Sequence, residues 1–183
     1  MRDFREIEGF TQVELIVAVA IVTIALAFAI PNIPKWRARA KLNGAARDLA
    51  SHFQFAKMEA VKRSDSYCAV TFNIAVDGTP YDAIVYLDDG NLQYDGEQIL
   101  RRVKFSDSIY KTISLDTNQG GGDGVSFADN GMGQPSIAFN PQGLPIDASG
   151  NIITAGADSV FIRNDRGGTK SITVSPAGNI RIN

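Results

Sequence analysis

The chain has 183 residues, of which 44% are hydrophobic and 21% charged, and its formal net charge is −2. This length fits one globular domain plus one further segment, and the near-neutral charge gives no general attraction for nucleic acid. Cys68 is the only cysteine, so no intramolecular disulfide can form. Because Cys68 lies in an apolar stretch, we expect it to be a buried small hydrophobic side chain.

A charged leader, residues 1–8, precedes Gly9 and a long apolar segment. Residues 15–30 alone are short for a membrane helix, but counting from Phe10 gives the required length of about 20 residues. Glu14 stands near the start of this segment, where a carboxylate is costly and marks a functional candidate. Phe10 and Glu14 are four residues apart and would share one face of a helix.

The order G-F-T-x-x-E-L that starts at Gly9 resembles the processing site of type IV prepilins and pseudopilins. The resemblance implies that a prepilin peptidase cleaves between Gly9 and Phe10 and methylates the new Phe10 amine. It also implies an assembly role for Glu14, because a charged amine in apolar surroundings needs a carboxylate partner on its own or a neighbouring subunit. Gln12 replaces the usual apolar residue and Glu8 the usual basic one, departures that would slow processing.

A secretory signal peptide is the competing interpretation of this segment. Ala27-Phe28-Ala29 has the A-x-A form of a cleavage site, and cleavage there would leave Ile30 as the mature N-terminus. A signal peptide begins with net positive charge, whereas here two arginines are outnumbered by four acidic residues up to Glu14. A further alternative is that Glu14 only reaches to the membrane edge. We favour the prepilin interpretation.

Four basic residues follow the apolar segment: Lys35, Arg37, Arg39 and Lys41. By the positive-inside tendency they would place the bulk of the chain in the cytoplasm. The family resemblance implies the opposite, a single-pass inner-membrane protein with a cytoplasmic N-terminus and a periplasmic globular domain. We follow the resemblance because the processing motif is more specific, and a solvated helix face is the alternative interpretation of the basic residues.

Residues 31–63 predict a second helical segment. Pro31 and Pro34 interrupt the first helix, and beyond them apolar residues recur every three or four positions: Leu42, Ala45, Ala46, Leu49, Phe53, Ala56 and Ala60. This stripe predicts an amphipathic helix packed on the rest of the domain. His52, the only histidine, lies in this helix without a cysteine or paired carboxylates nearby, so we expect a packing or surface role.

Residues 64–183 predict a β-rich domain. Eight short segments are rich in β-branched or aromatic residues: 67–73, 81–87, 99–105, 112–115, 136–140, 159–163, 171–175 and 179–182. Turn signals such as Asp77-Gly78 separate them. A helix followed only by strands is typical of the α+β class. We expect a pilin-like fold in which the long N-terminal helix, with a membrane half and an amphipathic half, packs on about eight antiparallel strands.

A second resemblance lies in the C-terminal part. Segment 138–144 (A-F-N-P-Q-G-L), the strand 161–163 with its arginine, the strand 172–175 and the terminal G-N-I-R of 178–181 look like the GspH/FimT family. These are minor pseudopilins of type II secretion systems and minor pilins of type IV pili. The resemblance implies a minor pseudopilin that assembles with other pseudopilins or pilins into a short periplasmic filament and contacts secreted cargo.

DNA binding belongs to the FimT-like alternative. Some pilus-associated members bind DNA through a terminal motif with two arginines, but here Asn179 replaces the first and only Arg181 is left. Further phosphate contacts could come from Arg163, Arg166 and Lys170. With half the motif missing and a negative net charge, we do not expect DNA binding. These cations then belong to a solvated sheet edge, and an unrelated secreted or membrane-tethered β-domain is the third alternative.

The sequence holds no catalytic motif, so we expect no enzyme activity, no cofactor and no metal. Residues 121–126 approximate one unit of a calcium-binding repeat, but Ser126 stands where an aspartate belongs. A single unit cannot build the stacked site. We interpret residues 116–135 as a mobile, variable contact loop.

Overall fold

The computed structural model describes residues 10–29, 32–107, 109–147, 149–153 and 158–183, and the chain divides into two compact units after Arg37. The first unit holds α1, Gln12–Ala29, which is apolar apart from Gln12, Glu14 and Thr23. Across the described residues, no helix combines the length and apolarity that a membrane crossing requires. The predicted segment 10–30 ends outside the described residues and stays a prediction.

Helix α2 spans Ile33–Lys62. Pro34 lies in its first turn, where the missing N–H costs no intrahelical hydrogen bond. Every residue of the predicted stripe is buried, and Ala38, Ala50 and His52 join it. The amphipathic helix is therefore confirmed, and its residues 38–62 belong to the second unit.

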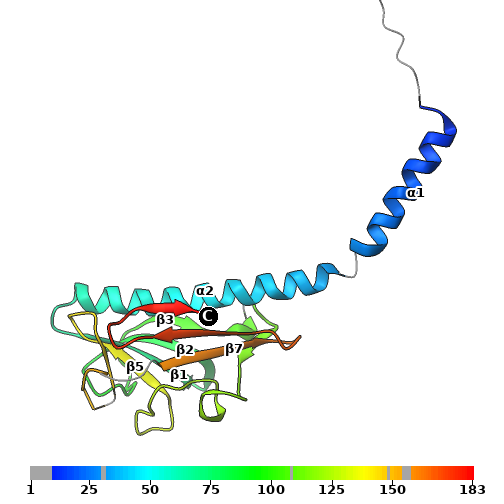
Figure 1. Cartoon of the computed structure of the whole chain (residues 1–183). Helices are drawn as coiled ribbons and strands as arrows, with labels where there is room; N and C mark the ends of the chain where they lie inside the picture. Colours follow the sequence, from blue (N-terminus) through cyan, green and yellow to red (C-terminus); the bar gives the residue numbers. More distant parts are fainter. Residues whose placement is uncertain (1–9, 30–31, 108, 148, 154–157) are drawn as a thin grey trace, which may run out of the picture. The chain divides into compact units, whose positions relative to one another are not determined.

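Nine strands complete the described part of the second unit: β1 Tyr67–Val76, β2 Thr79–Asp88, β3 Ile99–Val103, β4 Ile113–Leu115, β5 Ser136–Phe139, β6 Pro145–Ile146, β7 Asp158–Asn164, β8 Thr169–Val174 and β9 Ile180–Ile182. They form a five-stranded sheet in the order β3-β2-β1-β5-β6 and a four-stranded sheet in the order β4-β7-β8-β9. Their pairings are antiparallel. Figure 1 shows α2 running along the sheets. The predicted α+β, pilin-like fold is confirmed with all eight predicted strands, and the two-residue β6 adds a ninth.

The hairpin between β1 and β2 follows from its turn residues. Asp77 and Gly78 have φ values of 50° and 73°, and Val76 pairs with Thr79 across them. Two consecutive left-handed residues make the tight turn whose twist matches that of the strands. Asp77-Gly78 therefore sets the register of the two longest strands.

Strand β1 is buried on both of its faces. Val70 and Phe72 belong to the main core with α2, whereas Ala69 and Ile74 belong to a second, smaller core. Asn73, with a φ of 53°, separates Phe72 from Ile74 and moves Ile74 to the second face. The double burial explains why this strand is almost continuously apolar.

The main core joins the helix to both sheets. The ring centroids of Phe53 in α2 lie 6.0 Å from Phe72 and 5.8 Å from Phe127. Cys68 is fully buried in the same core, which confirms its predicted role as a small hydrophobic side chain. His52 is also buried, so of the two predicted roles it takes packing.

The glycine-rich loop between Asp116 and Gly124 follows β4, and both of its ends bond to β7. The Asp116 amide donates to the Phe161 carbonyl before the loop, and the Phe161 amide donates to the Gly124 carbonyl after it, each at 2.8 Å. Gly124 has a φ of 84°, and a Cβ there would lie 2.8 Å from the Asp116 nitrogen. Both ends of this loop therefore form hydrogen bonds to Phe161 of β7. The mobility expected for residues 116–135 stays a prediction.

Candidate functional site

The first candidate site is the start of α1. Gly9 and the rest of the leader lie outside the described residues, so the structure describes only the Phe10 side of the predicted cleavage point. The Phe10 side chain is 88% exposed. Phe10, the predicted cleavage and methylation residue, therefore lies just before this helix, and Glu14, the predicted assembly residue, lies in its first turn.

Glu14 forms a capping box with Thr11. The Glu14 Oε2 atom accepts hydrogen bonds of 3.0 Å from both the amide and the hydroxyl of Thr11. In return, the Glu14 amide donates to the Thr11 hydroxyl oxygen at 3.2 Å. This reciprocal pair satisfies two backbone donors that the helix leaves without an internal partner.

The capping box places the Glu14 carboxylate beside the backbone amide of Thr11, the residue that follows Phe10. Our sequence interpretation gave Glu14 a role in assembly and gave Thr11 none. The T-x-x-E spacing is itself the signature of a capping box and could have revealed the contact. Glu14 therefore has a local structural role in addition to any role between subunits.

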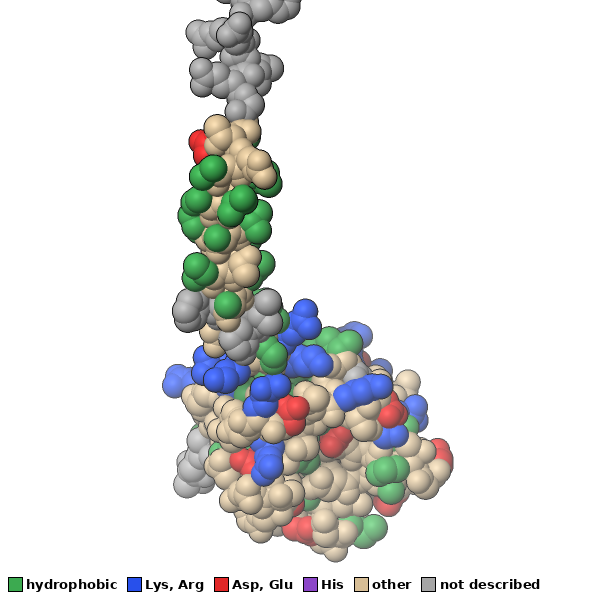
Figure 2. Space-filling view, turned by 90° about the vertical axis from the view of Figure 1, so that its right-hand side faces the viewer, with side chains coloured by type: hydrophobic (Ala, Val, Ile, Leu, Met, Phe, Trp, Pro, Cys, Tyr) green, Lys and Arg blue, Asp and Glu red, His purple; other side chains and the backbone are tan. Residues whose placement is uncertain are grey.

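The surface of α1 is apolar around its whole circumference. Its large hydrophobic side chains are each 50–70% exposed: Val13, Leu15, Ile16, Val17, Val19, Ile21, Val22, Ile24 and Leu26. Apolar side chains cover the face of this helix that Figure 2 shows. A helix that is apolar on every side belongs in a core or in lipid rather than in water. This surface therefore requires an apolar surrounding, which the helix does not supply by itself.

The second candidate site brings the two C-terminal family motifs together at Lys57. The Lys57 Nζ atom in α2 donates a 2.9 Å hydrogen bond to the Gly178 carbonyl. Gly178 has a φ of 70°, and a Cβ on it would lie 2.5 Å from the Gly143 carbonyl oxygen. A Cβ on Gly143 would in turn lie 3.0 Å from Lys57 Cε. Segments 138–144 and 178–181 thus meet against one lysine of the helix.

An open groove of about 590 Å³ lies next to this contact. Its lining comes from α2 and from the turn into β9: Gln54, Lys57, Met58, Gly178, Asn179, Ile180 and Arg181. The role of Lys57 was absent from our sequence-based expectations. Because Lys57 directly follows the stripe residue Ala56, the sequence puts it at the boundary of the buried helix face. No local sequence pattern predicts its contact with Gly178, which is more than a hundred residues away.

The four predicted phosphate contacts do not form one cluster. Strand register places Arg163 and Arg181 on the outer face of the four-stranded sheet and Lys170 on its core-facing side. Arg166 is exposed in the turn between β7 and β8. The Arg163 Nη1 atom lies 3.6 Å from Asp116 Oδ1, so its charge is partly compensated.

Comparison with known proteins identifies the family. The family model described as Type II transport protein GspH matches residues 45–178. This chain belongs to the GspH family. The predicted relation to the type IV pilin and pseudopilin superfamily is thereby confirmed.

A pilin-like relative covers nearly the whole chain. The pilin-like protein PilA1 of Thermus thermophilus is 23% identical over 174 residues, which are 95% of this chain and 97% of that protein. No solved structure matches. The GspH family consists of membrane-anchored, structural pilin-like proteins that assemble with other pilins. Membership of this family argues against the third alternative, a secreted or membrane-tethered β-domain of unrelated function.

Proposed function

We propose that this GspH-family chain is a minor pseudopilin of a type II secretion system. It is made as a prepilin, cleaved between Gly9 and Phe10, and methylated on the Phe10 amine. Residues 10–30 hold it in the inner membrane, with the N-terminus in the cytoplasm and the β-rich domain in the periplasm. It then joins a short periplasmic filament with other pseudopilins, where its outward domain contacts subunits or secreted cargo.

The observation that carries this proposal is an acidic first turn on a helix whose other residues are apolar except Gln12 and Thr23. Moving one exposed Val, Leu or Ile side chain from water into an apolar surrounding is favourable by about 1.5–3 kcal/mol. The exposed side chains of α1 therefore strongly favour lipid or neighbouring apolar helices over water, and van der Waals contact decides the packing between helices that are already in lipid. The same apolar surface suits the lipid bilayer before assembly and the filament core after it.

Glu14 gives this apolar packing a register. A carboxylate and an amine in apolar surroundings are each costly alone, and pairing offsets much of that cost. The cap holds the Glu14 carboxylate at the helix start, beside the residue that would carry the new Phe10 amine. An amine of the same or a neighbouring subunit can bind there. Where the amine belongs to a neighbouring subunit, helices slid out of register would leave both charges unpaired.

Three variants separate the charge of Glu14 from its cap. Glu14→Gln keeps the capping box, because glutamine also serves at this position, but removes the charge. Thr11→Ala removes the cap and keeps the charge, and Glu14→Ala removes both. We expect Glu14→Gln and Glu14→Ala to be lost from a sheared filament fraction, while Thr11→Ala is incorporated.

Two controls accompany this series. The mass of each chain must show that the leader is still cleaved, and the unfolding temperature of the β-rich domain must be unchanged. Normal incorporation of Glu14→Gln would contradict the charge role. A Thr11→Ala defect as severe as that of Glu14→Ala would show that the cap alone matters.

A minor pilin of a type IV pilus is the second candidate function, and the similarity to the pilin-like PilA1 supports it. Deleting the gene separates the two: lost secretion of exported proteins indicates the pseudopilin, and lost piliation indicates the pilin. DNA binding would be tested by a salt-dependent mobility shift with wild type and Arg181→Ala. We expect no specific shift, because Arg163 is paired with Asp116 and the four cations are separated.

A further inference from the structure

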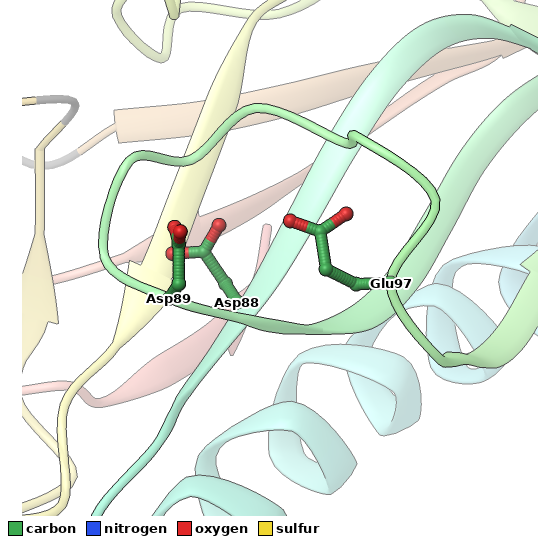
Figure 3. A group of neighbouring side chains, drawn as sticks. All are labelled: Asp88, Asp89 and Glu97. Carbon is green, nitrogen blue, oxygen red and sulfur yellow. The ribbon is translucent and has the colours of Figure 1, made fainter.

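Three carboxylates converge in the connection between β2 and β3. Asp88 is the last residue of β2, Asp89 follows it, and Glu97 stands two residues before β3 begins. One oxygen of each residue lies within 4.8 Å of the others. Figure 3 shows Asp88 between Asp89 and Glu97, with all three side chains on the same side of the loop.

Asp88 is buried with an unsatisfied oxygen. Its residue is only 4% exposed, and its Oδ1 atom accepts no hydrogen bond. The Oδ2 atom accepts a 2.8 Å hydrogen bond from the Gly90 amide, and the Leu92 amide lies near the same carboxyl group. A buried carboxylate oxygen without a partner is costly. This oxygen therefore calls for a cation or donor beside it.

The protein supplies no such cation within the described residues. The ion pairs found there involve Glu59, Asp107 and Asp116, and none includes Asp88, Asp89 or Glu97. Three neighbouring carboxylates repel one another when all are charged. A bound cation would remove both the repulsion and the unsatisfied oxygen.

The loop that carries these acids is fixed to the domain. Leu92 at its centre is fully buried, and its carbonyl accepts a 2.9 Å hydrogen bond from Asn130 Nδ2. Tyr94 packs edge-on against Tyr86, with ring centroids 5.4 Å apart. The loop thus holds its carboxylates in place in advance, which lowers the entropy lost on binding.

The donor set selects the kind of ion. All three side chains offer hard carboxylate oxygens and none offers sulfur or imidazole, which favours Ca²⁺ or Mg²⁺ over Zn²⁺. Ca²⁺ binds oxygens at about 2.4 Å, so two ligands on opposite sides of it stand about 4.8 Å apart. The three oxygens lie within 4.8 Å of one another, so a single ion can contact all of them. Mg²⁺ requires a tighter octahedron at about 2.1 Å and releases its waters reluctantly.

We propose that Asp88, Asp89 and Glu97 bind one calcium ion, with water and loop carbonyl oxygens completing its coordination. The ion ties the end of β2 to the residues that enter β3 and so stiffens this end of the five-stranded sheet. In the sequence these acids belong to the turn-like segments 88–90 (D-D-G) and 95–97 (D-G-E), so no local pattern predicts the site. The site does not depend on whether the filament is a pseudopilus or a pilus.

Calorimetric titration of the detergent-solubilised full chain with CaCl₂, after treatment with a chelator, tests the proposal. We expect one ion per chain with a Kd of about 10⁻⁵–10⁻³ M, and an unfolding temperature that rises with added calcium. Asp89→Asn and Glu97→Gln alter exposed or half-buried ligands and leave the fold intact. Each should weaken binding by about tenfold or more and reduce the temperature rise.

Asp95→Asn is the matched control. It removes the same charge from the same loop but lies outside the cluster, so its calcium binding should equal that of the wild type. Absence of a calcium response at about 5 mM CaCl₂ would overturn the proposal. An Asp95→Asn effect as large as that of Asp89→Asn, or an equal response to Mg²⁺, would also overturn it, because either result indicates attraction to acidic surface in general.

Discussion

The Lys57 Nζ atom in α2 lies 2.9 Å from the carbonyl oxygen of Gly178 in the turn that leads into β9. Gly178 in turn approaches the Gly143 carbonyl so closely that a Cβ would lie 2.5 Å from it. One contact therefore joins the helix, the loop after β5 and the last hairpin. The two C-terminal segments that resemble the GspH family meet here.

Replacing Gly178 with alanine should destabilise the β-rich domain by about 2–4 kcal/mol, because the new Cβ would collide with backbone and the residue has a left-handed φ. Gly167→Ala is the matched control, since Gly167 has a φ of 78° and open space around its Cβ position. It should cost only about 1 kcal/mol. Urea unfolding of the full chain measures both, and equal losses would contradict the close-packing account.

The origin of each contact decides whether the sequence could predict it. The stripe of α2 and the Asp77-Gly78 turn are local patterns, so periodicity and turn chemistry predict them. The contact between Gly143 and Gly178 joins residues far apart in the chain, and no local pattern encodes it. Asp88 and Leu92 are both buried, which the polar turn pattern around them does not predict. The Thr11–Glu14 cap is different, because its spacing is local and signals it directly.

His52 should make the domain less stable in mild acid. Burial lowers the pKa of His52 below its ordinary value of 6.5, with Asp48 opposing this shift and Arg101 adding to it. The unfolded chain then takes up a proton before the folded one does. The free energy of unfolding should therefore fall as the pH drops below about 6.5, until the lowered pKa of the folded state is passed.

A His52→Leu variant checks this dependence by urea unfolding at a series of pH values. Its unfolding free energy should vary less between about pH 7 and about pH 5 than that of the wild type. Superimposable pH profiles for the two proteins would show that His52 is not responsible.

Cys68 should be chemically inert in the folded protein. It is fully buried, and burial raises its pKa to about 12, so almost no thiolate forms near neutral pH. A disulfide-exchange reagent should leave the native chain unlabelled and react with one thiol per chain after unfolding in urea. Since Cys68 is the only cysteine, prompt labelling of the native protein would contradict this burial without ambiguity.

The mature N-terminus tests the central claim most directly. If the chain is a processed pilin-like subunit, mass spectrometry of the protein from its native membrane should find a chain that begins at Phe10 and carries one added methyl group on its amine. A chain that retains Met1–Gly9, or one that begins at Ile30 after signal-peptide cleavage, would contradict the account.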